Sequence, residues 1–80
     1  MSPAKKELDL STYQARFAAR LRELREKAGL SQVELAAAVG VQQNTLSRWE
    51  TAANAPAMGT FPALAKALKL DKVKDLFPDE

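Results

Sequence analysis

The chain has 80 residues, which is the size of one small domain. It contains no cysteine and no histidine, which removes thiolate metal sites and the usual general base, so we expect no metal, no cofactor, no small-molecule ligand and no enzymatic activity. Twelve Lys and Arg against ten Asp and Glu leave a net charge of +2, which permits nucleic-acid binding without arguing for it. No apolar run approaches the ~20 residues that span a bilayer, so we expect a cytoplasmic protein without a membrane segment.

The first predicted helix follows a short charged segment. Residues 1–10 mix charges with a proline, and we expect them to form a flexible arm. Apolar residues then repeat every three or four positions and predict a helix over residues 12–28. Ser11 and Gln14 have the spacing of a capping box, so both are expected to cap the start of this helix. Gly29 is expected to end it by taking a left-handed backbone conformation.

Four shorter helices are expected after the first. Ser31 and Glu34 have the spacing of a capping box and predict the start of the second helix, which Gly40 ends. Thr60 is expected to cap the fourth helix. No run of the sequence alternates with the period of a strand. The sequence therefore predicts an all-α domain of five helices over residues 11–77, with a tail at 78–80, the helices covering about 12–28, 32–39, 42–50, 61–69 and 72–77.

The segment 32–50, QVELAAAVGVQQNTLSRWE, has the spacing of a helix-turn-helix. Two helices that cross steeply touch near their turn, where Ala36 is small enough and Gly40 allows the bend. Leu46 and Trp49 are expected to be buried and to hold the second helix against the first. Any helical hairpin needs Ala and Gly near its bend, but here the cap, bend and core positions agree independently, which favours the helix-turn-helix interpretation.

With these residues the chain resembles the lambda-repressor-like (Cro/Xre) family of bacterial and phage regulators. The likeness runs from about Phe17 to Phe77 and is strongest in LRELREKAGLSQVELAAAVGV, LSRWE and LAKAL. It implies a compact DNA-binding domain and a transcriptional regulator, most often a repressor, that recognises a short operator in double-stranded DNA. Because one recognition helix reads few bases and symmetric operators suit dimers, we expect a homodimer.

The outward face of the third predicted helix is the candidate surface for reading bases. On a helical wheel with Leu46 buried, amides, hydroxyls and one guanidinium face outward, without Lys or Glu. Gln and Asn pair bidentately with adenine, and Arg pairs bidentately with guanine. A merely solvated polar face is the alternative. The candidates for base readout are Gln43, Asn44, Ser47 and Arg48.

The resemblance adds two pairs of residues. It implies that Gln32 contacts phosphate and steadies Gln43, and that Arg25 forms an ion pair with Glu50 that fixes the tilt of the recognition helix. An ordinary polar position for Gln32 and two solvated charges for the other pair are the alternatives. Further candidates for phosphate contact or positioning are Gln42, Thr45, Asn54 and Thr60.

The sequence also departs from the family in places. Gln42 stands where Ser or Thr is frequent, and Ala52 stands where Gly commonly ends the recognition helix. The loop after that helix lacks Lys and Arg. Together with the small net charge, this loop favours the alternative function of an adaptor or antitoxin-like module with weak DNA binding, whose partner would be a protein such as a toxin or RNA polymerase.

Apolar residues near the C-terminus are the candidates for the dimer contact. They are Leu70, Val73, Leu76 and Phe77. The alternative is that these residues only close the core of the domain.

Overall fold

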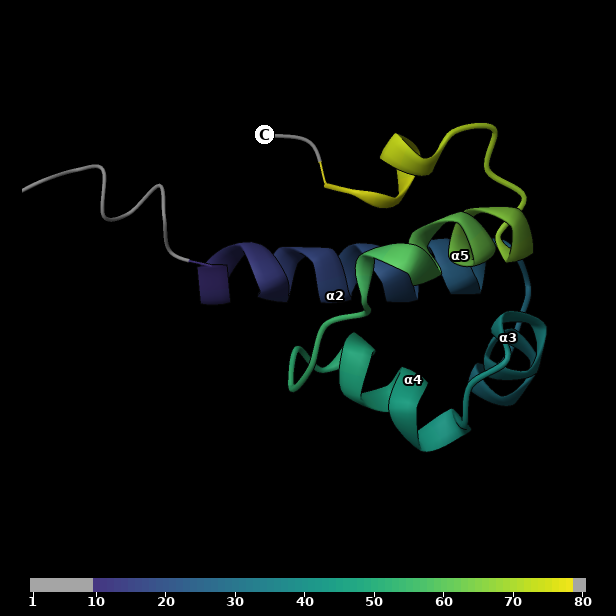
Figure 1. Cartoon of the computed structure of the whole chain (residues 1–80), viewed down its shortest axis with the longest axis horizontal. Coiled ribbons are helices and arrows are strands. Elements are labelled where there is room, and N and C mark those ends of the chain that lie inside the picture. The colour runs from purple at the N-terminus through teal and green to yellow at the C-terminus, as the bar shows by residue number, and fades with distance from the viewer. Residues whose placement is uncertain (1–9, 79–80) are drawn as a thin grey trace, which may run out of the picture.

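Four α-helices follow one another along the described part of the chain and surround one core (Figure 1). The structure, a computed structural model, describes residues 10–78. No strand occurs within this range, which confirms the all-α prediction. None of the helices described is long and apolar enough to cross a membrane. The elements are α2 (Leu10–Lys27), α3 (Gln32–Val39), α4 (Gln43–Glu50), the 3₁₀ helix η1 (Met58–Thr60), α5 (Phe61–Ala67) and the 3₁₀ helix η2 (Val73–Leu76).

The prediction of five helices is wrong at the C-terminal end. The segment expected as a fifth helix over 72–77 forms only the single 3₁₀ turn η2. Lys72 and Phe77 on either side of it have extended backbones, and Phe77 precedes Pro78, which disfavours the α conformation at that position. The residues between the extended Lys72 and Phe77 are too few to form an α-helix.

The first helix also differs from its predicted bounds. It is already helical at Leu10, so Ser11 lies within α2 and not before its first residue as predicted. Of the predicted arm over residues 1–10, all but Leu10 lies outside the described residues, as does the end of the tail at 79–80. The third helix begins at Gln43 because Gln42 has an extended backbone and its side chain makes no capping hydrogen bond.

The start of α3 is capped as the sequence predicts. The Ser31 hydroxyl accepts a hydrogen bond from the Glu34 amide at 3.0 Å, and the Glu34 carboxylate accepts one from the Ser31 amide at 2.8 Å. This reciprocal pair satisfies two amides that the helix itself leaves free. Thr60, in contrast, makes no capping hydrogen bond to α5, because η1 runs directly into that helix.

Each of the four helices is followed, within two residues of its end, by a residue with a left-handed backbone. Gly29 ends α2 and Gly40 ends α3, with φ of 76° and 91°, as predicted. Ala52 follows α4 with φ of 65°, and Lys69 follows α5 with φ of 61°. Because Lys69 turns the backbone, α5 stops before the predicted residue 69. A side chain is strained in this conformation, whereas glycine is not.

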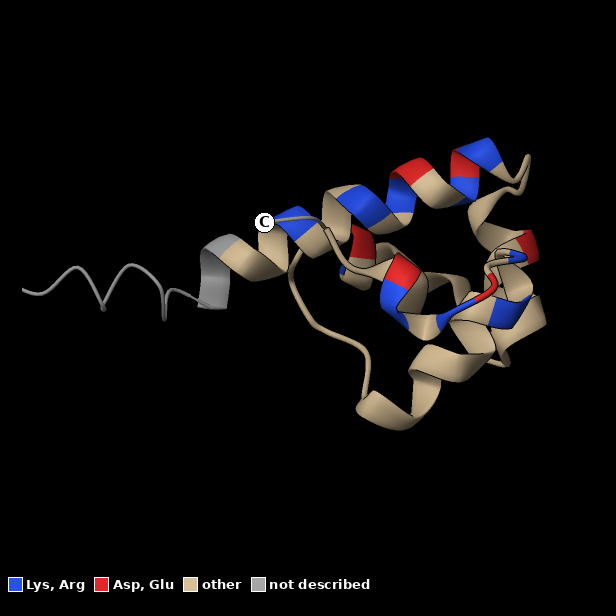
Figure 2. Cartoon of the chain, turned by 90° about the horizontal axis from the view of Figure 1, so that it is seen from above, with Lys and Arg blue, Asp and Glu red and all other residues tan. Residues whose placement is uncertain are grey.

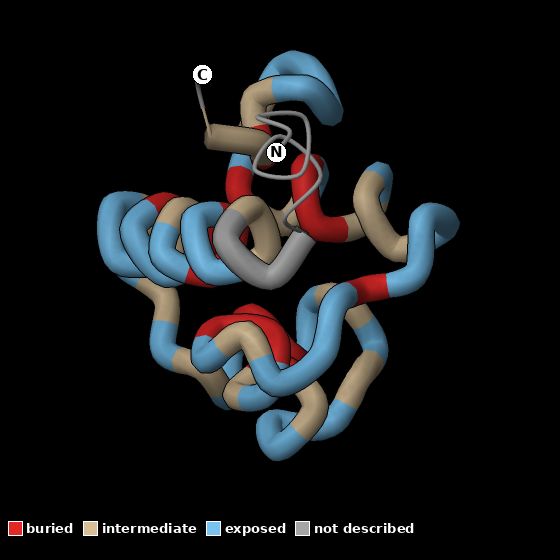
Figure 3. Tube along the Cα trace, turned by 90° about the vertical axis from the view of Figure 1, so that its left-hand side faces the viewer, coloured by how far each residue is buried: buried red, intermediate tan, exposed pale blue. Residues whose placement is uncertain are grey.

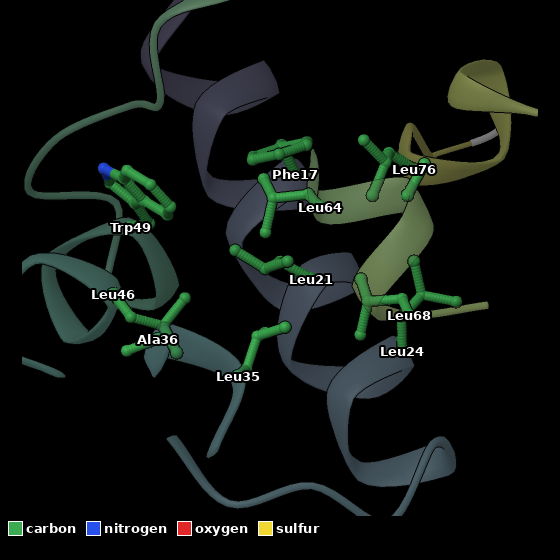
Figure 4. Close-up of a cluster of buried hydrophobic side chains, with 11 residues drawn as sticks. Phe17, Leu21, Leu24, Leu35, Ala36, Leu46, Trp49, Leu64, Leu68 and Leu76 are labelled. Carbon is green, nitrogen blue, oxygen red and sulfur yellow. The ribbon is translucent and has the colours of Figure 1, made fainter. Parts of the chain in front are cut away.

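The core lies where the inner faces of the helices meet (Figures 3 and 4). Leu21 of α2, Leu35 of α3, Leu46 of α4 and Leu64 of α5 are fully buried. Ala36 and Trp49 belong to the same cluster, so the small residue and the aromatic ring lie at the buried positions that the sequence predicts. These contacts hold α3 and α4 on one side of α2 and leave the outer face of α4 free.

The C-terminal segment closes this core. Leu76 is fully buried, and the ring of Phe77 lies 5.5 Å from that of Phe17 and 5.1 Å from that of Phe61, centroid to centroid. Leu70 and Phe77 are partly buried against the core. Leu76 is therefore a core residue and not a surface for a second subunit, which corrects its assignment as a dimer contact. Of the four candidates only Val73, 38% exposed, has a largely open side chain.

Candidate nucleic-acid interface

The α4 helix has one apolar face and one polar face. Leu46 and Trp49 point into the core. Gln43, Asn44 and Arg48 are exposed on the other side, and Thr45 and Ser47 are partly exposed at its edges. The acidic residue of this helix, Glu50, is buried, so the exposed face of α4 carries hydrogen-bonding groups and one positive charge. A surface of this kind suits the edges of bases in a major groove.

Gln43 is held by Gln32, the first residue of α3. Gln43 Nε2 donates a hydrogen bond to Gln32 Oε1 at 2.9 Å. The structure thus brings together the two glutamines that the family resemblance pairs. The consequence is that the Gln43 side chain is fixed at one end before any ligand arrives, which lowers the entropy that binding would cost.

Gln32 is in turn held by Glu50, the last residue of α4. Gln32 Nε2 donates to Glu50 Oε1 at 3.0 Å. Sequence reasoning missed this contact, because residues 18 positions apart on different helices share no local pattern. It depends on the crossing of α3 and α4, which brings the start of one helix to the end of the other.

Arg25 of α2 completes the chain of contacts. Its Nε donates to Glu50 Oε2 at 2.7 Å, its Nη2 donates to Glu50 Oε1 at 3.1 Å, and its Nη1 donates to the Leu30 carbonyl at 2.9 Å. The side chains of Arg25 and Glu50 are only 12% and 2% exposed. The hydrogen bond that Arg25 donates to Glu50 raises the pKa of Arg25 above its ordinary value, against the opposing effect of burial. This arginine therefore stays charged at any physiological pH.

A second contact from α2 secures the end of α4. Gln14 Nε2 donates to the Ala52 carbonyl at 3.1 Å. Sequence reasoning gave Gln14 a local capping role at the start of its own helix and missed this long-range contact. Together with Arg25, Gln14 ties the C-terminal end of α4 to the longest helix of the domain.

The other candidate residues lie around α4 but outside this chain of contacts. Gln42 is exposed immediately before the helix, Asn54 is exposed in the segment after it, and Thr60 is partly buried at the end of η1. Among the described residues no hydrogen bond joins these three side chains to the glutamine pair. Gln42 directly precedes α4 and Asn54 follows it closely, and such flanking positions suit contacts with phosphates more than contacts with bases.

Charge is unevenly distributed over the domain. In Figure 2, α2 carries blue segments along its length and red ones in its second half, whereas the segment between α4 and α5 is tan. That segment, TAANAPAMGT, contains no charged residue. Phosphates near α4 would therefore meet backbone amides, hydroxyls, Asn54 and Arg48 rather than a cluster of lysines.

The chain is similar to known helix-turn-helix proteins in sequence and in fold. The family of helix-turn-helix domains matches residues 16–76. A similar solved structure is the high-resolution crystal structure of the restriction-modification controller protein C.AhdI from Aeromonas hydrophila. The two chains are 33% identical, the match covers 80% of this chain and 96% of that one, and the TM-score is 0.75. No curated protein sequence matches the chain.

Proposed function

The chain belongs to the lambda-repressor-like (Cro/Xre) helix-turn-helix family, and we propose that it is a sequence-specific regulator that places α4 in the major groove of a short operator. The observation that carries this proposal is the exposed face of α4, where Gln43 is already fixed by Gln32. Base readout requires a side chain that is held in one orientation, whereas a merely solvated surface does not. Because a protein bound to an operator excludes polymerase from the same DNA, repression is the proposed output.

Each exposed residue of α4 has a role in the proposal. Gln43 and Asn44 pair with adenine, Arg48 pairs with guanine, and Ser47 contacts either. Gln32 uses one amide hydrogen on Glu50, which leaves the second for a phosphate oxygen. The first amides of α4 have no side-chain cap from Gln42, and they are further donors for phosphate.

We infer that the regulator acts as a homodimer. A single α4 touches only a few base pairs, and a two-fold axis in the protein would match two half-sites about 34 Å apart. Val73 is the most exposed of the C-terminal apolar residues, with Leu70 and Phe77 partly buried beside it. Analytical ultracentrifugation of the free chain and of its DNA complex tests the dimer. A monomer in the free state, together with one copy per operator in the complex, would refute it.

The function itself is tested by selection from a pool of duplexes with a randomised central region. The full chain is expected to enrich a two-fold-symmetric sequence over successive rounds. Enrichment of no sequence at all, at low salt and at micromolar protein, would reject the regulator and leave the adaptor function as the explanation of this fold. The similarity to a restriction-modification controller supports the first outcome.

A further inference from the structure

The carboxylate of Glu50 determines which group donates and which accepts in two hydrogen bonds, the one between Gln32 and Glu50 and the one between Gln43 and Gln32. An ionised carboxylate only accepts hydrogen bonds. Both oxygens of the Glu50 carboxylate already accept hydrogen bonds from Arg25, at 2.7 and 3.1 Å. The Gln32 side-chain amide must therefore turn its NH₂ group, and not its oxygen, toward Glu50. The Gln32 Nε2 atom lies 3.0 Å from Glu50 Oε1.

This direction passes from Gln32 to Gln43. With its nitrogen turned to Glu50, Gln32 presents its oxygen to the neighbouring glutamine. Gln43 must answer with its own NH₂ group, which lies 2.9 Å from Gln32 Oε1. Because the buried carboxylate can only accept, the two successive hydrogen bonds fix which end of the exposed Gln43 amide faces Gln32.

The outcome is a fixed pattern on the exposed side of Gln43. One of its two amide hydrogens is used on Gln32, so one N–H donor and the carbonyl acceptor remain. Adenine offers the complementary pair in the major groove, the N7 acceptor and the N6 donor. Guanine offers two acceptors, N7 and O6, and Gln43 has only one donor left for them.

We propose that Glu50, which lies too deep to touch DNA, is a positioning residue that makes Gln43 select adenine over guanine by fixing the orientation of two amides. If the orientation were reversed, Gln43 would accept from Gln32 and turn both amide hydrogens outward. It would then match the two acceptors of guanine, and the N6 donor of adenine would lose its acceptor. The proposal rests on the proposed function, because it explains why Gln43, which pairs with adenine there, discriminates against guanine.

The test uses the full chain and the operator that the wild-type protein selects. The position read by Gln43 is the base pair whose preference disappears in Gln43→Ala. Two duplexes are then compared by fluorescence anisotropy, one with adenine and one with guanine at that position. The wild-type protein is expected to prefer adenine by about 10- to 100-fold, which is the discrimination of one bidentate pair.

Two single variants remove the fixed direction in different ways. In Glu50→Gln the new amide donates to Gln32 Oε1 and reverses both glutamines, and in Gln32→Met the link to Gln43 is absent while the Arg25–Glu50 pair stays. Each is expected to bring the preference for adenine below about 3-fold and to leave the preferences at the other positions unchanged. The second variant keeps the buried ion pair, so it tests the proposal even where Glu50→Gln fails to fold.

The double variant Gln32→Glu/Glu50→Gln gives the decisive comparison. It moves the carboxylate one step toward Gln43 without changing the composition or net charge, and the carboxylate now at position 32 again accepts from the Gln43 NH₂ group. The preference for adenine is expected to return to within about 3-fold of wild type, whatever the overall affinity. The inference is overturned if the single variants keep the preference for adenine, or if the double variant does not regain it. Either result leaves the proposed regulator function intact. A wild-type protein that selects no sequence overturns both.

Discussion

Glu50 at the end of α4 forms a buried bidentate ion pair with Arg25 of α2, and its carboxylate also accepts a hydrogen bond from Gln32 of α3. One carboxylate therefore joins all three helices that orient the candidate recognition surface. The core packing sets where α4 lies, and this carboxylate sets how its C-terminal end is turned relative to α3. Stability and readout should consequently be linked at this residue.

Removing one partner of the ion pair is expected to destabilise the domain strongly. In Arg25→Met the buried Glu50 loses its countercharge, and losses of this kind cost about 3–5 kcal/mol. Urea unfolding followed by the fluorescence of Trp49 measures the change. The matched control is Arg25→Met/Glu50→Leu, which removes both charges and should lose clearly less. A loss below about 1 kcal/mol in the single variant, as for a surface pair, would contradict a buried pair.

The contribution of this pair should not change with pH in the neutral range. The pKa of Arg25 is raised in the folded state by its hydrogen bond to Glu50. A group with a raised folded pKa stabilises fully below its unfolded pKa and loses that effect only as the pH rises through the folded value, which for arginine lies far above neutrality. The difference in unfolding free energy between wild type and Arg25→Met/Glu50→Leu, which leaves no unpaired carboxylate behind, should be equal at about pH 6 and about pH 9. A difference that shrinks over this interval would show that Arg25 titrates.

The end of α4 can be stabilised at Ala52. Its φ of 65° is unfavourable for any residue with a side chain, so Ala52→Gly should raise the free energy of unfolding by about 0.5–1 kcal/mol. The hydrogen bond from Gln14 is to the backbone carbonyl and is not affected. Ala53→Gly is the control, since this neighbour has no left-handed backbone to relieve and glycine there only adds freedom to the unfolded chain. Equal effects of the two substitutions would refute the explanation.

Binding to DNA should depend only moderately on salt. Arg48 is the one cation of α4, and the segment that follows carries none, so a dimer is expected to neutralise no more than about 4–6 phosphates, with the cations beyond the two Arg48 side chains coming from other elements. This number corresponds to a slope of about −4 to −5 in a plot of log K against log salt concentration. Titrations at several potassium chloride concentrations measure the slope. A value much steeper than this would mean that the basic residues of α2 also contact the DNA.

The parts of the fold that the sequence predicts correctly depend on neighbours along the chain. The capping box of Ser31 and Glu34, and the left-handed glycines at 29 and 40, follow from spacings of a few residues. Burial of Trp49 follows from helical periodicity. The hydrogen bonds from Gln14 to Ala52 and from Gln32 to Glu50 cannot be predicted in this way. They connect different helices, and the packing of the whole core determines how those helices cross. The 3₁₀ turn at η2 was also missed, since apolar spacing alone does not separate one short turn from a short helix.

The central claim is that exposed residues of α4 read bases, and one measurement tests it most directly. Operator selections from a randomised pool are run in parallel with wild type, Gln43→Ala, Arg48→Ala and the control Arg22→Ala, which removes an exposed arginine from α2. Each α4 variant should lose its preference at a single position of each half-site, by about 1–3 kcal/mol, while the control keeps the wild-type sequence. The same preferred sequence from all four proteins, with only the overall affinity changed, would contradict the claim and assign these residues to contacts with the DNA backbone.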